Sequence, residues 1–189
     1  ATKSSLTGIT FAIEGDPQLA ELLKGIATDL GGKWIEVPAH AKVLYHVAAV
    51  LVSNYTSTLM QEGAALLRQL GVSEPTASTA LLPLLQGTVE NIERHGFPAS
   101  LTGPVARGDV GTICKHLEEI RRSAPELLTA YRALGMLTVP FAESKGTVGE
   151  EAVSIMRGLF AEEESHHNAA LIPPLANQNN PTAVEEVRS

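Results

Sequence analysis

The sequence predicts a mainly α-helical protein in which a short strand–helix–strand unit precedes a helical bundle. Apolar residues make up 44% of the 189 residues, which is enough for a buried core. Two short runs rich in β-branched and aromatic residues, 8–14 and 33–37, read as strands. Beyond residue 38, apolar residues recur at helical spacing over long stretches. These observations together give the predicted order of elements.

The strand–helix–strand unit covers residues 8–37. Asp16 is expected to cap a helix that has Pro17 at its first position and stops before Gly31. Parallel strands joined by a crossover helix need a larger sheet that covers both faces. We therefore expect this unit to be a piece of a larger domain.

Residues 39–164 are predicted to form an all-α domain, followed by a flexible tail at 165–189. The first half of this domain is expected to contain one long helix over 39–70 and a second over 74–95, kinked at Pro83.

The second half is predicted to open with a long loop at 96–108, after which Asp109 caps a helix to about residue 122. A further helix is expected to end at Gly135, with an irregular segment at 136–149 and a weaker helix at 150–164.

Charge and cysteine content exclude several classes of function. The net charge of −7 argues against a general nucleic-acid-binding protein. The single cysteine, Cys114, excludes an internal disulfide and a multi-cysteine zinc site, and favours a reducing cytoplasm. No apolar run is long enough to span a membrane. No metal site is expected, and His166 and His167 are interpreted as solvated residues.

The predicted long helix carries a polar stripe of four side chains, Lys42, His46, Ser53 and Asn54. At 100° per residue, His46 and Ser53 lie about 20° apart and His46 and Asn54 about 80° apart. An ammonium, an imidazole, a hydroxyl and an amide could hold a carbonyl or hydroxyl substrate and move a proton. The alternative is that Tyr45, His46 and Asn54 are hydrogen-bonded packing residues between helices.

A second candidate is the 101–109 loop, LTGPVARGD, which contains Thr102 and Arg107. Its glycines and proline fix an unusual backbone path beside a helix N-terminus, and Arg107 carries a fork suited to a carboxylate or phosphate. The alternative is a structural turn in which Arg107 pairs with Asp109.

Three segments, LTGITFAIEGD (6–16), LYHVAAVLVSNY (44–55) and LTGPVARGD (101–109), resemble the Rossmann-like, DUF2520-type family of NAD(P)-dependent oxidoreductases. The resemblance covers about residues 6–135. It implies a fold like the 6-phosphogluconate dehydrogenase superfamily, in which an N-terminal dinucleotide domain precedes a helical domain that often forms the dimer. This chain then corresponds to the C-terminal part, with residues 1–38 as the C-terminal remnant of the Rossmann-like dinucleotide-binding domain. The main cofactor site, for NADP or NAD, is expected outside it.

Related enzymes such as ketopantoate reductase use a lysine early on the long helix and asparagines one and two turns later. The resemblance places His46 at the lysine position, Val50 at the first asparagine position and Asn54 at the second. A permanent cation is thus replaced by a group that titrates near neutrality.

Two functions follow from these patterns. In the first, the complete protein is an oxidoreductase that acts on a small carbonyl compound or hydroxy acid. His46, Asn54 and Ser53 are then catalytic, Thr102, Arg107 and Lys42 bind substrate, and this chain alone is inactive. In the second, the chain is a non-catalytic dimerising or ligand-sensing module. A homodimer is expected in both, because the long helix is strongly apolar.

Overall fold

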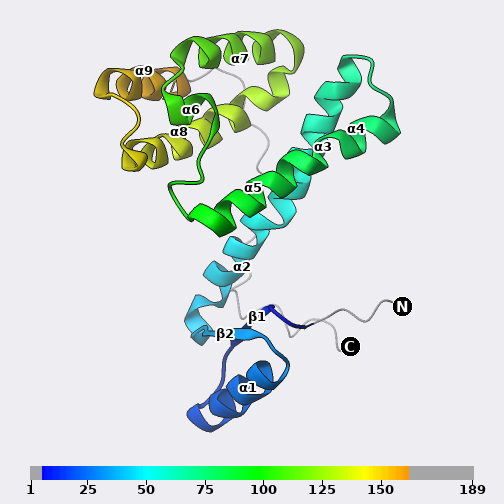
Figure 1. Cartoon of the computed structure of the whole chain (residues 1–189), viewed down its shortest axis with the longest axis vertical. Helices are drawn as coiled ribbons and strands as arrows, with labels where there is room; N and C mark the ends of the chain where they lie inside the picture. Colours follow the sequence, from blue (N-terminus) through cyan, green and yellow to red (C-terminus); the bar gives the residue numbers. More distant parts are fainter. Residues whose placement is uncertain (1–5, 162–189) are drawn as a thin grey trace, which may run out of the picture. The chain divides into compact units, whose positions relative to one another are not determined.

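A computed structural model describes residues 6–161. It is mainly helical, with one short parallel sheet near the N-terminus, as the sequence predicts (Figure 1). The chain forms two compact units, residues 1–90 and 91–189, and each is described by itself below. The boundary predicted near residue 38 lies inside the first unit, and the tail predicted at 165–189 lies outside the described residues.

The first unit begins with a strand–helix–strand element that follows the prediction closely. Strand β1 (Thr10–Ile13) pairs in parallel with β2 (Lys33–Glu36), and helix α1 (Pro17–Asp29) connects them (Figure 1). Asp16 caps α1, since its Oδ1 accepts a hydrogen bond from the Leu19 N–H at 3.0 Å. The predicted cap is therefore confirmed.

Lys24 ties α1 to β2. Its Nζ lies 2.6 Å from a carboxylate oxygen of Glu21, forms an ion pair with Glu36, and sits 4.8 Å from the ring centre of Trp34. These contacts raise the pKa of Lys24, chiefly through the hydrogen bond to Glu21. A single side chain thus joins the helix to both ends of the second strand.

The predicted long helix is divided into two. A short 3₁₀ turn (Ala39–Ala41) leads into α2 (Lys42–Val52), which is separated from α3 (Asn54–Gln69) by Ser53 alone. The hydroxyls of Ser57 and Thr58 donate back to the carbonyls of Ser53 and Asn54 at 3.2 and 3.3 Å. Such back-bonding bends helices, which accounts for the break at this point.

The second predicted helix is also divided, into α4 (Glu74–Ala80) and α5 (Leu82–His95). The break falls at Leu81, because Pro83 is tolerated only in the first turn of a helix. A Cβ at Gly63 would lie 2.6 Å from Cδ1 of Leu81. Helix α3 therefore packs very closely against this junction.

The second unit contains four helices around one core within its described residues, α6 (Gly103–Arg107), α7 (Val110–Ser123), α8 (Leu128–Lys145) and α9 (Glu150–Ala161). A 3₁₀ turn (Pro125–Leu127) joins α7 to α8. The side chains buried in the core come from α7, α8 and α9 and are Ile113, Leu117, Leu128, Val139, Val153, Met156 and Phe160.

Three predictions for this unit were wrong. The loop expected at 96–108 contains α6. Helix α8 does not stop at Gly135, and the segment 136–149 is not irregular, because α8 continues to Lys145. The reason is tertiary: Gly135 is buried, and a Cβ there would lie 2.4 Å from the ring of Phe160. Glycine at this position permits a close helix–helix approach instead of ending the helix.

Candidate functional site

The polar stripe lies on an exposed helical face of the first unit. Lys42 and His46 are exposed on α2, Ser53 stands at the break, and Asn54 opens α3. Ser53 keeps a right-handed backbone (φ −95°, ψ −65°), and its N–H bonds to the Ala49 carbonyl at 2.9 Å. The helical rotation is therefore nearly preserved across the break, and the four residues stay on neighbouring parts of one surface.

Lys42 is not isolated on this stripe, because its ammonium forms an ion pair with Glu14, which directly follows β1. The pair links the sheet to the start of α2. Each of these side chains remains partly exposed, so water screens their attraction. Lys42 could bind a substrate carboxylate only by sharing its charge with Glu14.

Apolar side chains surround the polar stripe on α2. Val43, Leu44 and Val52 are 77%, 72% and 76% exposed, and α2 contains no buried residue. Within the described residues of the first unit, α2 contacts the turn before it and α3 after it. A helix that is apolar on nearly all sides is normally covered by other protein, and this one is not covered inside its own unit.

A groove lies along α3, and the sequence analysis did not predict it. Its volume is about 640 Å³, and the α3 side chains in its wall recur at intervals of four residues. They are Thr56, Ser57, Met60, Gln61, Ala64 and Arg68; the opposite wall consists of Glu74, Ser78, Leu82 and Leu85 from α4 and α5. We call this the α3 groove. The spacing of four residues between these α3 side chains was the sequence signal for a groove. That spacing does not show which helix forms the opposite wall.

One end of the α3 groove is charged. Nη1 of Arg68 lies 3.2 and 3.1 Å from the two carboxylate oxygens of Glu74, and the hydroxyl of Ser78 donates to Glu74 Oε1 at 3.2 Å. The side chains of Arg68 and Glu74 are 37% and 65% exposed. The groove therefore presents a positive and a negative group side by side to solvent.

The 101–109 loop lies in the second unit and includes α6. Thr102 and Arg107 are exposed, and Asp109 caps α7 as predicted. Asp109 accepts hydrogen bonds from the N–H and hydroxyl of Thr112 at 3.0 and 2.8 Å, and these bonds lower the pKa of the Asp109 carboxyl. The positive charge of Arg107 adds a smaller lowering of the pKa of Asp109, although no contact within 4 Å between the two side chains is seen among the described residues.

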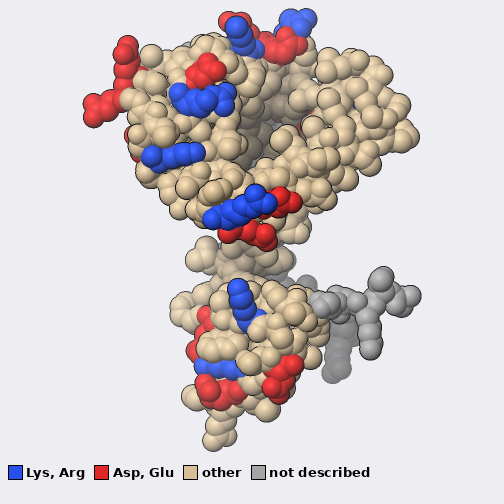
Figure 2. Space-filling view, in the orientation of Figure 1, with Lys and Arg blue, Asp and Glu red and all other residues tan. Residues whose placement is uncertain are grey.

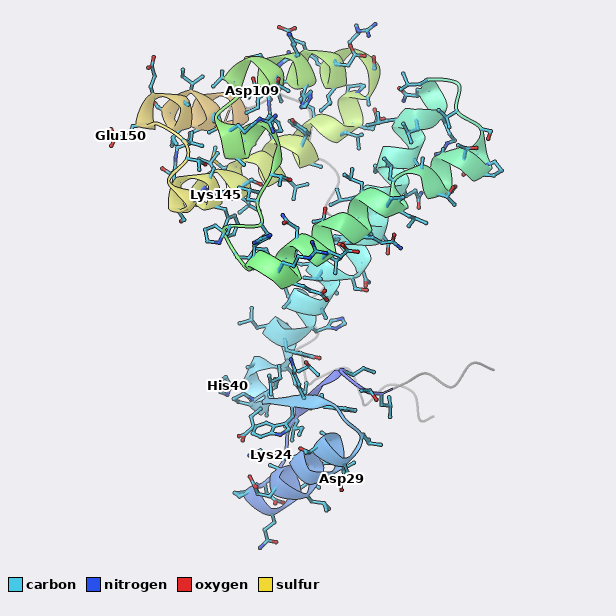
Figure 3. The ribbon with its side chains drawn as sticks, viewed as in Figure 1. Lys24, Asp29, His40, Asp109, Lys145 and Glu150 are labelled. Atoms are coloured by element: carbon cyan, nitrogen blue, oxygen red, sulfur yellow. The ribbon has the colours of Figure 1, made fainter. Side chains whose placement is uncertain are left out.

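Residues from outside the loop hold its backbone in place. Lys145, at the end of α8, donates to the Leu101 carbonyl at 2.7 Å, and Thr147 donates to the Ala106 carbonyl at 2.9 Å (Figure 3 labels Lys145 and Asp109). Asn91 donates to the carbonyl of Ser100 at 2.7 Å. The path of the loop is thus fixed by contacts at several points along it.

The structure places the predicted site residues in two groups. Lys42, His46, Ser53 and Asn54 lie together in the first unit, whereas Thr102 and Arg107 belong to the second. Each group is described within its own unit. The individual roles assigned to these six residues therefore remain predictions.

Three further properties of the described residues bear on function: surface charge, metal clusters and membrane-spanning helices. On the face shown in Figure 2, Lys and Arg side chains lie beside Asp and Glu side chains and form no continuous basic patch. Among residues 6–161, no cluster of three or more His, Cys, Asp or Glu is placed to hold a metal ion. None of the described helices is long and apolar enough to cross a membrane.

The turn from β1 into α1 does not fit the pyrophosphate of a dinucleotide cofactor. Asp16 already places a carboxylate on the Leu19 N–H, and Pro17 has no N–H to offer. Dinucleotide-binding turns need glycines and a free helix N-terminus at this point. The side chain of Leu19 also crowds Gly15, at 3.0 Å from a Cβ built there.

Comparison with known proteins identifies relatives for most of the chain. The sequence profile of a family described as "Domain of unknown function (DUF2520)" matches residues 9–138. The crystal structure of protein TM1727 from Thermotoga maritima is 31% identical and superposes with a TM-score of 0.67. The match covers 72% of this chain and 54% of that one, so this chain spans about half of the length of TM1727. Comparison with curated proteins gave no match.

Proposed function

The chain belongs to the DUF2520 family, and we propose that it is the helical, substrate-binding and dimerising part of an NAD(P)-dependent oxidoreductase acting on a small carbonyl compound or hydroxy acid. The observation that carries the proposal is the polar stripe. Lys42, His46 and Ser53 form a narrow polar surface on a helix whose other sides are apolar and exposed. Such a surface sets an ammonium, an imidazole and a hydroxyl where they could exchange a proton with a substrate oxygen.

In this proposal His46 exchanges a proton with the substrate oxygen, while Ser53 and Asn54 orient that oxygen by hydrogen bonds. Thr102 and Arg107 bind the substrate carboxylate, and Lys42 adds positive charge beside it. A nicotinamide cofactor, NADP or NAD, belongs to the proposal for the complete protein. None is proposed for residues 6–161 alone, because the turn from β1 into α1, at Asp16, does not fit the pyrophosphate.

The test is consumption of NADPH by the complete protein with a panel of 2-oxo acids. We expect His46→Ala to abolish turnover and leave self-association unchanged. His95→Ala, which changes an exposed histidine at the end of α5, is the matched control and should retain turnover. Turnover by the His46→Ala protein at the wild-type rate would contradict the proposal.

A second candidate function is a non-catalytic dimerising or ligand-sensing module. It is favoured by the ion pair of Lys42 with Glu14, because Glu14 neutralises the positive charge of the polar stripe. It is also favoured by the resemblance, which places Val50 where related enzymes have an asparagine. It predicts that the complete protein binds NADPH and turns over none of the 2-oxo or 2-hydroxy acids. Reproducible NADPH oxidation with one acid excludes it.

Both functions include a homodimer, which we propose is formed through α2. The exposed Val43, Leu44 and Val52 would be covered by the second copy. Light scattering should show a dimer that Leu44→Glu converts to a monomer. Leu70→Glu is the control, since Leu70 is 79% exposed but lies at the end of α3. A monomer mass at all concentrations would refute the dimer.

A cytoplasmic location, inferred from the single Cys114, belongs to the same proposal.

A further inference from the structure

The α3 groove has the size and the fixed walls of a small-molecule site. Its volume of about 640 Å³ falls within the usual range for ligand pockets. The close approach of Gly63 to Leu81 holds the α3 wall against the junction of α4 and α5, and Ala64 on α3 and Ala77 on α4 are both buried. All of its lining residues belong to the first unit, so the groove does not depend on how the two units are placed.

The charged end of the groove is complementary to a ligand with both charges. A guanidinium has five N–H donors, so Arg68 can hold Glu74 and still donate to another carboxylate. Glu74 has further lone pairs for an ammonium group. A purely anionic ligand would be repelled by Glu74, and a purely cationic ligand by Arg68. A zwitterion whose ammonium and carboxylate groups are attached to the same carbon atom satisfies both residues.

The rest of the groove is suited to an aliphatic chain. Met60, Leu82 and Leu85 supply apolar surface in the groove, beside the polar side chains of Ser57 and Gln61. Arg68 lies eight positions after Met60, which corresponds to about 12 Å along the helix axis. The long side chain of Arg68 covers part of that distance, and an aliphatic side chain of about four carbon atoms covers the rest.

We propose that the α3 groove binds a free α-amino acid with an aliphatic side chain. Arg68 binds the carboxylate, Glu74 binds the ammonium, and the side chain lies along Met60 and Leu85. None of these residues belongs to the polar stripe or to the 101–109 loop. The proposal therefore goes beyond the oxidoreductase function and does not depend on it.

Methionine methyl NMR on the full chain tests this directly. The sequence has three methionines; Met60 lines the groove, whereas Met136 and Met156 belong to the core of the second unit. L-norleucine is the probe. Hexanoate lacks its ammonium and pentylamine lacks its carboxylate. We expect norleucine to shift the Met60 signal saturably with a roughly millimolar Kd, and to leave the other two signals in place.

We expect hexanoate and pentylamine to bind at least about tenfold more weakly than norleucine. The carboxylate of hexanoate is repelled by Glu74, and the ammonium group of pentylamine is repelled by Arg68. Arg68→Met and Glu74→Gln should each weaken norleucine binding by about tenfold. Arg121→Met removes an exposed arginine of α7 and should leave binding unchanged. Circular dichroism establishes that each variant is folded.

Three results would overturn the proposal. The first is no saturable shift of Met60 with norleucine. The second is equal binding of norleucine, hexanoate and pentylamine. The third is a Met60 signal that changes with protein concentration and is insensitive to norleucine, which would mean that a second copy of the chain fills the groove.

Discussion

Replacing Gly135 by alanine should destabilise the second unit, although alanine is the better helix former. Gly135 lies in the middle of α8, where alanine ordinarily adds about 1 kcal/mol to stability. Here the new Cβ would lie 2.4 to 2.7 Å from three atoms of the Phe160 ring. That ring is buried and packs on Tyr131 at 6.4 Å between centres, so it has little room to move.

Overpacking of this kind costs about 1–3 kcal/mol, and the helix-propensity gain offsets part of it. Because three ring atoms would be overlapped, the cost lies in the upper part of that range, and we expect a net loss of about 1–2 kcal/mol in the free energy of unfolding. Gly158→Ala is the matched control, because Gly158 is exposed on α9 and nothing lies within 4 Å of a Cβ there. It should gain about 0.5–1 kcal/mol.

Thermal unfolding followed by far-ultraviolet circular dichroism measures both variants. In a unit of about 100 residues, 1 kcal/mol corresponds to a change of roughly 4–8 °C in Tm, so the opposite signs are easily resolved. If Gly135→Ala proved as stable as Gly158→Ala, the close α8–α9 approach inferred here would be wrong.

Three further predictions concern the cap of α7, the 101–109 loop and the first unit. Because the pKa of Asp109 is lowered in the folded protein, the ionised carboxylate stabilises the fold at pH values above the ordinary pKa of 3.8. This contribution is lost as the pH falls through the folded-state pKa. In a pH series, the Tm of Asp109→Asn should therefore fall less steeply below about pH 4 than the Tm of the wild type. Lys145→Met should cost about 1–2 kcal/mol in urea unfolding, because it leaves the Leu101 carbonyl without its charged donor; an unchanged midpoint would refute this. Fluorescence of Trp34, the only tryptophan, should report unfolding at a lower urea concentration than circular dichroism, because the strand–helix–strand element buries few side chains; coincident curves would contradict this.

The parts of the fold that local chemistry determines could be predicted from the sequence. Asp16 and Asp109 cap helices because a short carboxylate reaches the N–H three residues ahead whatever surrounds it. The parallel pair of strands followed from two short runs rich in β-branched and aromatic residues.

The features that the sequence did not reveal depend on distant contacts. Gly135 resembles a helix stop until Phe160, 25 positions later, is placed against it. The α3 groove was missed for the same reason, since Arg68 and Glu74 become a site only when α4 folds back along α3. Helical periodicity placed Lys42, His46 and Ser53 on one surface, but it carries no information about whether the 101–109 loop meets them.

The hydrogen bonds from Lys145 and Thr147 also determine where a recombinant fragment of this protein should end. The family profile ends at residue 138, yet these two residues beyond it hold the carbonyls of Leu101 and Ala106 inside the matched region. A recombinant fragment that stopped at the family boundary would also lose the last turns of α8 and all of α9, including Met156 and Phe160. The segment that the family profile matches is therefore smaller than the packed second unit, and expression designs should extend at least to the end of α9.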